Sequence, residues 1–273
     1  MEVKFVKMSP TQNMTILVES LLPRESYQQV ARELMKYENI HAEQVGFIEP
    51  AERPEAWARL WMMGGEFCGN ASMALAAFLA WERNLPAGQP LNVPLEVSGL
   101  QDLITVSLTR QEYESRCSIQ MPPPEKIEFL TLSLKDQVYQ AAVIHLEGIT
   151  HIIIDAAQVS GDKERFAEMA IREWAKHFNP EALGVVIFDR VRNYIKPLVY
   201  VPSAGSLTWE RGCGSGTAAI GAFLAHSASG TIGADITQPG GVISVKAGYD
   251  QERMMKTAIT GQVRLVARGV AYL

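Results

Sequence analysis

The chain has 273 residues, which is enough for one large domain or two smaller ones. Hydrophobic residues make up 47% and charged residues 20%, so the composition is that of a folded globular protein and excludes intrinsic disorder. A net charge of −5 argues against nucleic acid or an anionic membrane surface as the main partner.

The first five residues lack the basic segment and apolar run of a secretory signal. The longest uncharged apolar stretch, residues 71–81, is too short to cross a bilayer, so we expect a cytoplasmic protein. The three cysteines, Cys68, Cys117 and Cys213, form no C-x-x-C pair and lie apart from the histidines. We therefore expect neither a disulfide framework nor a metal site.

In the first half of the chain, Val3 and Phe5 predict a strand, and the run 15–18 predicts a second strand. Residues 25–37 predict a helix with Val30, Leu34 and Tyr37 on one face. No residue from Cys68 to Trp81 is charged. An amphipathic helix would have a polar face, so this segment predicts a helix that is buried on all sides.

Three prolines at 122–124 break the pattern and predict a boundary, with one half at 1–124 and the other at 125–273. The second half has strand patterns at 142–146, 151–155 and 198–201. Asp162 can cap a helix whose apolar residues follow helical spacing as far as Phe178. A second uncharged helix follows Cys213 and reaches residue 225.

The two uncharged helices belong to an internal repeat. When residues 68–80 are laid on residues 213–225, seven of the thirteen positions are identical, at an offset of 145 residues. Upstream, 43–48 resembles 181–186, and 13–18 resembles 149–154. The sequence therefore predicts an α+β fold of two pseudo-symmetric α/β halves, each a sheet wrapped around a central buried helix.

The duplicated Cys-Gly pairs, each at the start of a predicted helix, indicate a candidate catalytic site. A helix N-terminus offers backbone N–H groups and a positive partial charge, which stabilise a thiolate or hold a carboxylate. If the halves pack about a pseudo-twofold axis, Cys68 and Cys213 could face one substrate from opposite sides. One thiolate would remove a proton from a carbon while the other thiol protonates the opposite face. The configuration at that carbon would be inverted.

Other motifs give weaker evidence of a functional site. Cys117 reads as a buried apolar thiol, and His145 and His151 read as packed strand histidines. The G-x-G-x-G run at 212–216 does not have dinucleotide-binding spacing. No lysine is singled out for a pyridoxal Schiff base.

At Cys68-Gly69-Asn70 and Glu210-Arg211-Gly212-Cys213-Gly214-Ser215-Gly216, the sequence resembles the diaminopimelate epimerase family of cofactor-independent amino-acid racemases. The resemblance spans essentially the whole chain and is closest to the histidine racemases, some of which supply D-histidine for opine-type metallophores. It implies an active site between the halves, a small-molecule amino-acid substrate, no cofactor and a homodimer.

The resemblance also implies roles for individual residues. Cys68 and Cys213 would be the acid/base pair, and Asn13 and Gln44 would line the substrate pocket. Gly69, Asn70, Gly214 and Ser215 would present helix N-terminal amides to the α-carboxylate. Glu210, and less directly Glu66, would accept the α-ammonium or an imidazole N–H.

The sequence departs from the diaminopimelate pattern where that family uses asparagines for the distal end of its substrate. The matching positions here are Ile149, Leu183 and Met62. Without polar partners, a second charged end would be desolvated without compensation, which favours histidine. The role of Arg211 stays open. The alternatives are diaminopimelate or proline-type epimerisation, a non-racemising isomerase of the same fold, and an amino-acid-binding module without chemistry.

Overall fold

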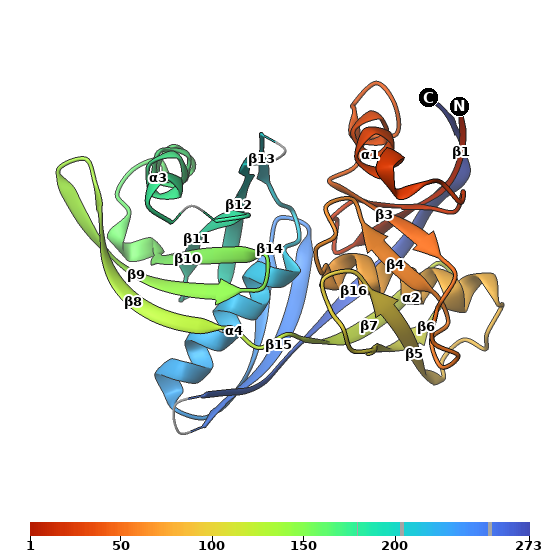
Figure 1. The fold of residues 1–273 in the computed structure, drawn as a ribbon. Coiled ribbons are helices and arrows are strands. Elements are labelled where there is room, and N and C mark those ends of the chain that lie inside the picture. Colours follow the sequence, from red (N-terminus) through yellow and green to blue (C-terminus); the bar gives the residue numbers. More distant parts are fainter. Residues whose placement is uncertain (179, 203–204, 251–252) are drawn as a thin grey trace. The chain divides into compact units, whose positions relative to one another are not determined.

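The computed structural model describes residues 1–178, 180–202, 205–250 and 253–273. These residues form a mixed α/β fold, with strands β1–β16 and helices α1–α4 (Figure 1). The chain divides into two compact units. Unit 1 consists of Met1–Gln120 and Thr260–Leu273, and unit 2 consists of Met121–Ile259. The boundary inferred from the sequence, between residues 124 and 125, stays a prediction. The sequence analysis did not predict that Thr260–Leu273 would belong to unit 1.

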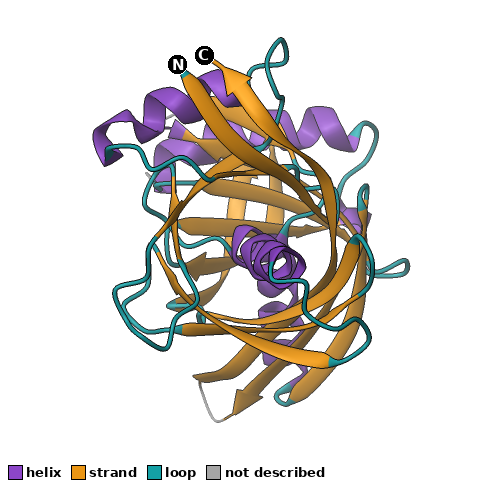
Figure 2. Ribbon diagram, turned by 90° about the vertical axis from the view of Figure 1, so that its right-hand side faces the viewer, coloured by secondary structure: helices purple, strands orange, loops and turns teal. Residues whose placement is uncertain are grey.

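Unit 1 is mostly strand. Its strands are β1 (Glu2–Pro10), β2 (Thr15–Val18), β3 (Gln44–Glu49), β4 (Arg59–Met62), β5 (Pro90–Val97), β6 (Ile104–Arg110), β7 (Glu114–Met121) and the last part of β16 (Arg253–Tyr272). They pair in chain order from β1 to β7, and β16 pairs with both β7 and β1, so the strands close into a ring. Figure 2 shows a helix seen end-on inside a ring of strands.

Helix α2 (Gly69–Glu82) contacts strands β1, β2, β5 and β6 of this ring. Every residue from Gly69 to Ala80 is buried, which confirms the prediction of a helix with no exposed face. Its small residues, many of them alanine, let the surrounding strands approach closely. Helix α1 (Tyr27–Met35) lies against β3 and, unlike α2, buries one face, through Tyr27, Val30, Ala31 and Leu34.

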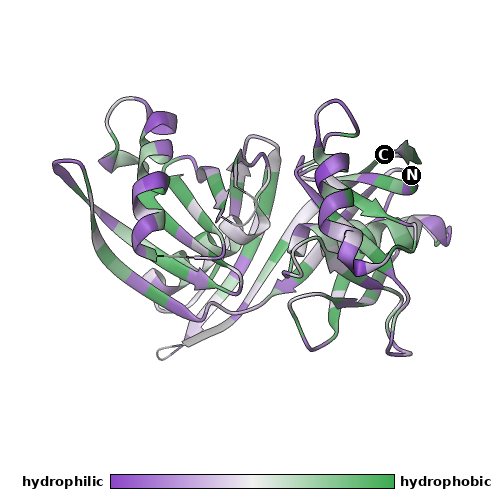
Figure 3. Cartoon of the chain, turned by 45° about the horizontal axis from the view of Figure 1, so that its top comes forward, coloured by the Kyte–Doolittle hydropathy of each residue, from purple (hydrophilic) through white to green (hydrophobic). Residues whose placement is uncertain are grey.

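Unit 2 contains the first part of β16 and all of the remaining strands. They are β8 (Lys126–Leu134), β9 (Gln137–Leu146), β10 (Ile149–Asp155), β11 (Leu183–Asp189), β12 (Tyr194–Val201), β13 (Ser206–Trp209), β14 (Thr231–Gln238) and β15 (Gly241–Asp250). The order across the sheet is β8-β9-β10-β11-β12-β14-β15, with β13 paired to β12. Figure 3 shows hydrophobic and hydrophilic residues alternating along many strands, as expected when one strand face packs on a core.

Two helices of unit 2 cover its sheet. Helix α4 (Gly214–Ala228) contacts β9, β10, β14 and β15, and nearly all of its residues as far as Ala225 are buried. Helix α3 (Lys163–Phe178) is amphipathic and contacts β8, β11 and β12 through a core that includes the fully buried Trp174. Asp162 Oδ1 accepts the N–H groups of Glu164 and Arg165, which confirms the predicted cap.

Most predicted elements agree with the structure, with some different ends. The strand predicted at 15–18 is β2, while the helix predicted at 25–37 is shorter, because a 3-10 turn occupies Arg24–Ser26 and Lys36 leaves helical geometry. The described part of the chain contains no helix that is both long enough and apolar enough to cross a membrane.

The strand registers correct one part of the predicted repeat. In unit 1, Leu17 on β2 is paired in register with Gly46 on β3, and in unit 2 His151 on β10 is paired with Gly184 on β11. If the two glycines correspond, then Leu17 corresponds to His151, two residues away from the alignment of 13–18 on 149–154. A shift of two keeps each side chain on the same face of the sheet, so the local sequence pattern could not reveal it.

Candidate active site

Cys68 is the N-cap residue of α2. Its backbone is extended, with φ −135° and ψ 111°, and its Sγ accepts the N–H of Ala71 at 3.4 Å. The Ser72 hydroxyl donates to the Cys68 carbonyl at 2.8 Å. Gly69 and Asn70 form the first turn of the helix, as predicted, and both are buried. The sulfur therefore lies at the positive end of a buried helix.

A chain of side-chain amides reaches Cys68 from strands β2 and β3. The Cys68 thiol donates to Gln44 Oε1, with a sulfur–oxygen distance of 3.1 Å. Gln44 Nε2 donates to Asn13 Oδ1 at 2.6 Å and to Thr15 Oγ1 at 2.8 Å. Asn13 Nδ2 donates to Glu43 Oε2 at 2.6 Å. The structure thus brings together three predicted site residues, Asn13, Gln44 and Cys68, and adds Thr15 and Glu43.

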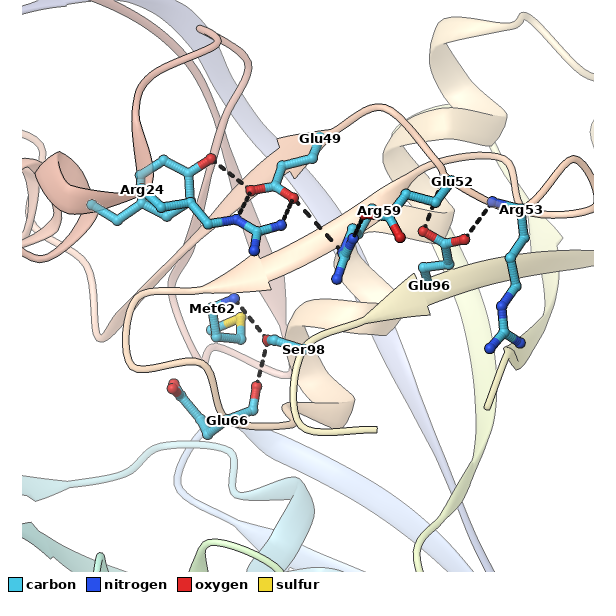
Figure 4. Close-up of polar contacts among 10 residues, drawn as sticks. Arg24, Glu49, Glu52, Arg53, Arg59, Met62, Glu66, Glu96 and Ser98 are labelled. Carbon is cyan, nitrogen blue, oxygen red and sulfur yellow. Dashed lines mark hydrogen bonds and ion pairs between the residues drawn. The ribbon is translucent and has the colours of Figure 1, made fainter. Parts of the chain in front are cut away.

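Glu66 lies two residues before Cys68 and is held through its main chain. Ser98 Oγ donates to the Glu66 carbonyl at 2.7 Å and accepts the Met62 N–H at 2.9 Å (Figure 4). Burial raises the pKa of the Glu66 carboxyl, against the N–H groups of Glu66 and Gly64, which lower it. Glu66 does not take part in the amide chain described above.

The outer ends of β3 and β4 are fixed by Glu49, as Figure 4 shows. Arg24 binds this carboxylate through Nε at 2.9 Å and Nη2 at 2.6 Å, and the Tyr27 hydroxyl donates to it at 2.8 Å. The Arg24 guanidinium also lies 3.7 Å from the centre of the Trp61 ring. The pKa of Glu49 is lowered, chiefly by the Arg24 hydrogen bond, and burial raises the pKa of Tyr27 to about 12. This network anchors the strand that carries Gln44.

Cys213 is the N-cap residue of α4 and repeats the geometry of Cys68. Its Sγ accepts the Gly216 N–H at 3.2 Å, and the Thr217 hydroxyl donates to its carbonyl at 2.7 Å, as Ser72 does in unit 1. Gln238 accepts the Cys213 N–H and donates to Thr217 Oγ1, both at 2.7 Å. Gln238 thus holds in place the backbone that presents this thiol, a role that the sequence analysis did not predict.

Ser215 joins Cys213 to a buried imidazole. Its Oγ lies 3.5 Å from Cys213 Sγ and 2.9 Å from His151 Nε2. His151 is fully buried, and burial lowers its pKa to about 4, so the ring is neutral. A Cβ on Gly184 would lie 2.2 Å from His151 Nδ1, so only glycine leaves room for this ring. His151 is packed in a strand, as predicted, but it also contacts a predicted site residue.

The Cys213 thiol faces a carboxylate. It is hydrogen-bonded to Glu210, and burial together with this negative charge raises the pKa of Cys213 well above its usual range, while Ser215 and the Gly216 N–H lower it. Burial also raises the pKa of Glu210, which the hydrogen bond from Cys213 lowers. At neutral pH the sulfur is therefore a thiol, with a proton acceptor in contact.

The predicted site residues form two local sets. In unit 2, Glu210, Cys213 and Ser215 are in contact, and Gly214 begins α4. The other predicted residues lie in unit 1. Of the three positions at which the sequence departs from the diaminopimelate pattern, Leu183 lies in the apolar core of unit 2 and Met62 is almost fully buried. Cys117 is fully buried on β7, and burial raises its pKa. Among the described residues, no group of three or more His, Cys, Asp or Glu could hold a metal ion.

Comparison with known proteins places these features in a family. Residues 2–272 match the family described as the histidine racemase CntK N-terminal domain. The chain is 35% identical to a histidine racemase of Staphylococcus aureus, over 99% of this chain and 98% of the relative. It is 30% identical to a histidine racemase of Fusobacterium nucleatum, over 98% of this chain and 96% of the relative.

Solved structures with the same fold are more distant in sequence. A hydroxyproline epimerase from Agrobacterium vitis aligns with a TM-score of 0.71 at 12% identity and covers all of this chain and 93% of its own. A PhzF-family protein from Bacillus anthracis aligns with a TM-score of 0.68 at 11% identity, over the whole of both chains. By sequence, the chain belongs to the histidine racemase family.

Proposed function

We propose that this protein interconverts L- and D-histidine, using Cys68 and Cys213 as the two acid/base groups. One observation carries the proposal. Two cysteines, related by the internal repeat, each cap a buried helix and accept an N–H group from its first turn. The full-length matches to histidine racemases support the choice of substrate.

In the proposed reaction, the two halves of a diaminopimelate epimerase-like fold enclose the amino acid. One cysteine thiolate takes the proton from the α-carbon, and the C–H electron pair moves toward the carboxylate. The thiol of the other cysteine then gives its proton to the opposite face of that carbon. The product is the other enantiomer, and the protonation states of the two cysteines are exchanged. For the next turnover, proton exchange with solvent restores the original states.

The remaining predicted residues hold the substrate in this proposal. N–H groups of Gly69, Asn70, Gly214 and Ser215 bind the α-carboxylate, where negative charge grows in the transition state. Asn13 and Gln44 line the pocket. Glu210 and Glu66 accept N–H groups of the substrate. No cofactor takes part, and the homodimer and the cytoplasmic location stay predictions.

The test is proton NMR of L-histidine in D₂O with the reduced protein, followed by chiral chromatography. We expect the α-proton signal to disappear and D-histidine to form. Cys68→Ser and Cys213→Ser should each lower kcat by roughly 10²–10⁴-fold, which is the usual contribution of a general acid or base. Racemisation at the normal rate in either variant would exclude the two-cysteine mechanism.

Cys117→Ala is the matched control, because this third thiol is fully buried in β7 and makes only long contacts, of 3.8 Å and 3.9 Å, with the carbonyls of Met73 and Ser115. It should racemise histidine at the normal rate. LL-diaminopimelate and L-proline belong in the same series. Exchange of only one of these would keep the mechanism and reject histidine. Saturable binding of an amino acid without exchange would indicate a binding protein.

A further inference from the structure

Both polar atoms of the Gln44 carboxamide make hydrogen bonds. Its nitrogen donates both of its protons, one to Asn13 Oδ1 and one to Thr15 Oγ1, while its oxygen faces Cys68 Sγ. The Thr15 hydroxyl donates its own proton to the Asn13 carbonyl at 3.1 Å, so its oxygen is free to accept from Gln44. A carboxamide oxygen only accepts hydrogen bonds. Cys68 must therefore donate, and this arrangement favours its protonated form.

Neither amide fixes that direction by itself. A half-turn of a carboxamide exchanges its oxygen with its nitrogen at little steric cost, so a hydrogen-bond network decides the orientation. If Asn13 and Gln44 both turned, Gln44 would offer an N–H group to Cys68 Sγ. That contact would favour the thiolate. The two arrangements place opposite demands on the proton of Cys68.

Glu43 distinguishes the two arrangements. Its Oε2 lies 2.6 Å from Asn13 Nδ2. An ionised carboxylate has acceptors and no donor, so turning Asn13 would place two oxygens against each other. Among these hydrogen-bonded side chains, the carboxylate of Glu43 is therefore the group that is compatible with only one orientation of the amides.

We propose that Glu43 is a positioning residue for racemisation, because it orients Asn13 and, through Asn13, turns the oxygen of Gln44 toward the Cys68 thiol. The inference rests on the two-cysteine function proposed above. In this scheme Glu43 acts on Cys68 through the side-chain amides of Asn13 and Gln44.

The corresponding place in unit 2 shows that these hydrogen-bonded side-chain amides are not a general feature of the repeat. Glu181 aligns with Glu43, but it is exposed and is followed by Ala182, which has no side-chain amide. There the thiol of Cys213 meets the carboxylate of Glu210 instead. The two duplicated thiols therefore donate to different kinds of acceptor, a neutral amide in unit 1 and a carboxylate in unit 2.

The first test measures the alkylation of Cys68 by iodoacetamide at pH 7, read by mass spectrometry of the peptide that contains it. Glu43→Gln offers both a donor and an acceptor to Asn13, so the amides can reverse. We expect alkylation to be about 5- to 10-fold faster, the factor that corresponds to one hydrogen bond of ordinary net strength. Glu181→Gln makes the same chemical change at the aligned position and should leave the rate unchanged. An unchanged rate in Glu43→Gln would overturn the proposal.

Loss of the Glu43 charge could also act on Cys68 directly through space. Asn13→Ala separates the two explanations, because it cuts the chain but keeps the carboxylate. If the amides transmit the effect, Asn13→Ala should also speed alkylation, and the double variant should be no faster than the faster single variant. Effects that multiply in the double variant would show a direct charge effect and refute the chain.

Kinetics supply a readout that general damage would not change. The two enantiomers have equal free energy, so kcat/KM must stay equal in the two directions. Each enantiomer needs Cys68 in a different protonation state, so Glu43→Gln should change the ratio of the two KM values by the same 5- to 10-fold factor. A rise in both KM values at a constant ratio would refute positioning. If the unaltered protein does not racemise histidine, the proposed function fails, while the alkylation result stands by itself.

Discussion

Ser215 connects two buried groups of unit 2 through one hydroxyl, which lies between His151 Nε2 and Cys213 Sγ. The contact lowers the pKa of Cys213, so Ser215→Ala should raise that pKa and reduce the thiolate fraction at neutral pH. We expect kcat to fall roughly 5- to 10-fold. The rise of the rate with pH should also move to higher pH.

Ser227→Ala is the matched control for this prediction. It lies on the same helix, where its hydroxyl donates to the Phe223 carbonyl at 2.8 Å. Its pH–rate profile should match that of the unaltered protein. If Ser215→Ala left the profile in place, the hydroxyl would have no influence on Cys213.

At the scale of elements, the turn after β5 supports the segment that leads into α2. Gly99 has φ +79°, and a Cβ there would lie 2.4 Å from the Phe67 backbone nitrogen. Gly99→Ala should therefore destabilise the protein by more than the ordinary cost of a left-handed alanine, about 1–2 kcal/mol. It should also displace Cys68 and lower kcat. Urea unfolding and histidine racemisation would measure the two effects.

Gly88 allows the steric part to be isolated. It has a similar φ of +77°, but nothing lies within 4 Å of its Cβ position. Gly88→Ala should show only the conformational cost and keep full activity. Equal losses of stability in the two variants would mean that the Phe67 contact is relieved by a small movement.

The helices that present both thiols could be predicted because their signal is local. An uncharged run after a Cys-Gly pair indicates a buried helix start without reference to any other part of the chain. The amide chain could not be predicted in this way. It joins Asn13, Gln44 and Cys68 across a parallel strand pairing, whose register is set by long-range packing. The position of His151 against Gly184 could not be predicted either, because it also depends on the register of a parallel strand pair.

At the scale of the whole molecule, His151 makes stability depend on pH. Its ordinary pKa is 6.5 and its pKa in the folded protein is about 4. Above pH 6.5 the ring is neutral in both states, and this contribution to stability is complete. As pH falls from 6.5 toward 4, only the unfolded chain gains the proton, so stability decreases, by up to about 3 kcal/mol.

His151→Leu removes the titrating imidazole and should therefore remove this dependence. Leucine is a suitable replacement because Leu17 occupies the corresponding place in unit 1. Urea unfolding at pH 7.0, 5.5 and 4.5 would measure it as the difference between variant and unaltered protein, in which the other titrating groups largely cancel. Parallel loss of stability in the two proteins would show that the imidazole is not the group responsible.

Unit 1 is built from two segments that are far apart in the chain, Met1–Gln120 and Thr260–Leu273. This has a consequence during synthesis on the ribosome. The first segment emerges early, but its ring of strands cannot close until β16 arrives to pair with β1 and β7. At roughly 5–20 residues per second, translation of the intervening unit 2 takes on the order of 10–30 s. Throughout that interval the nascent chain carries two open strand edges beside the apolar helix that bears Cys68. We therefore expect the first unit made to be the last one completed, and to depend on chaperones until translation ends.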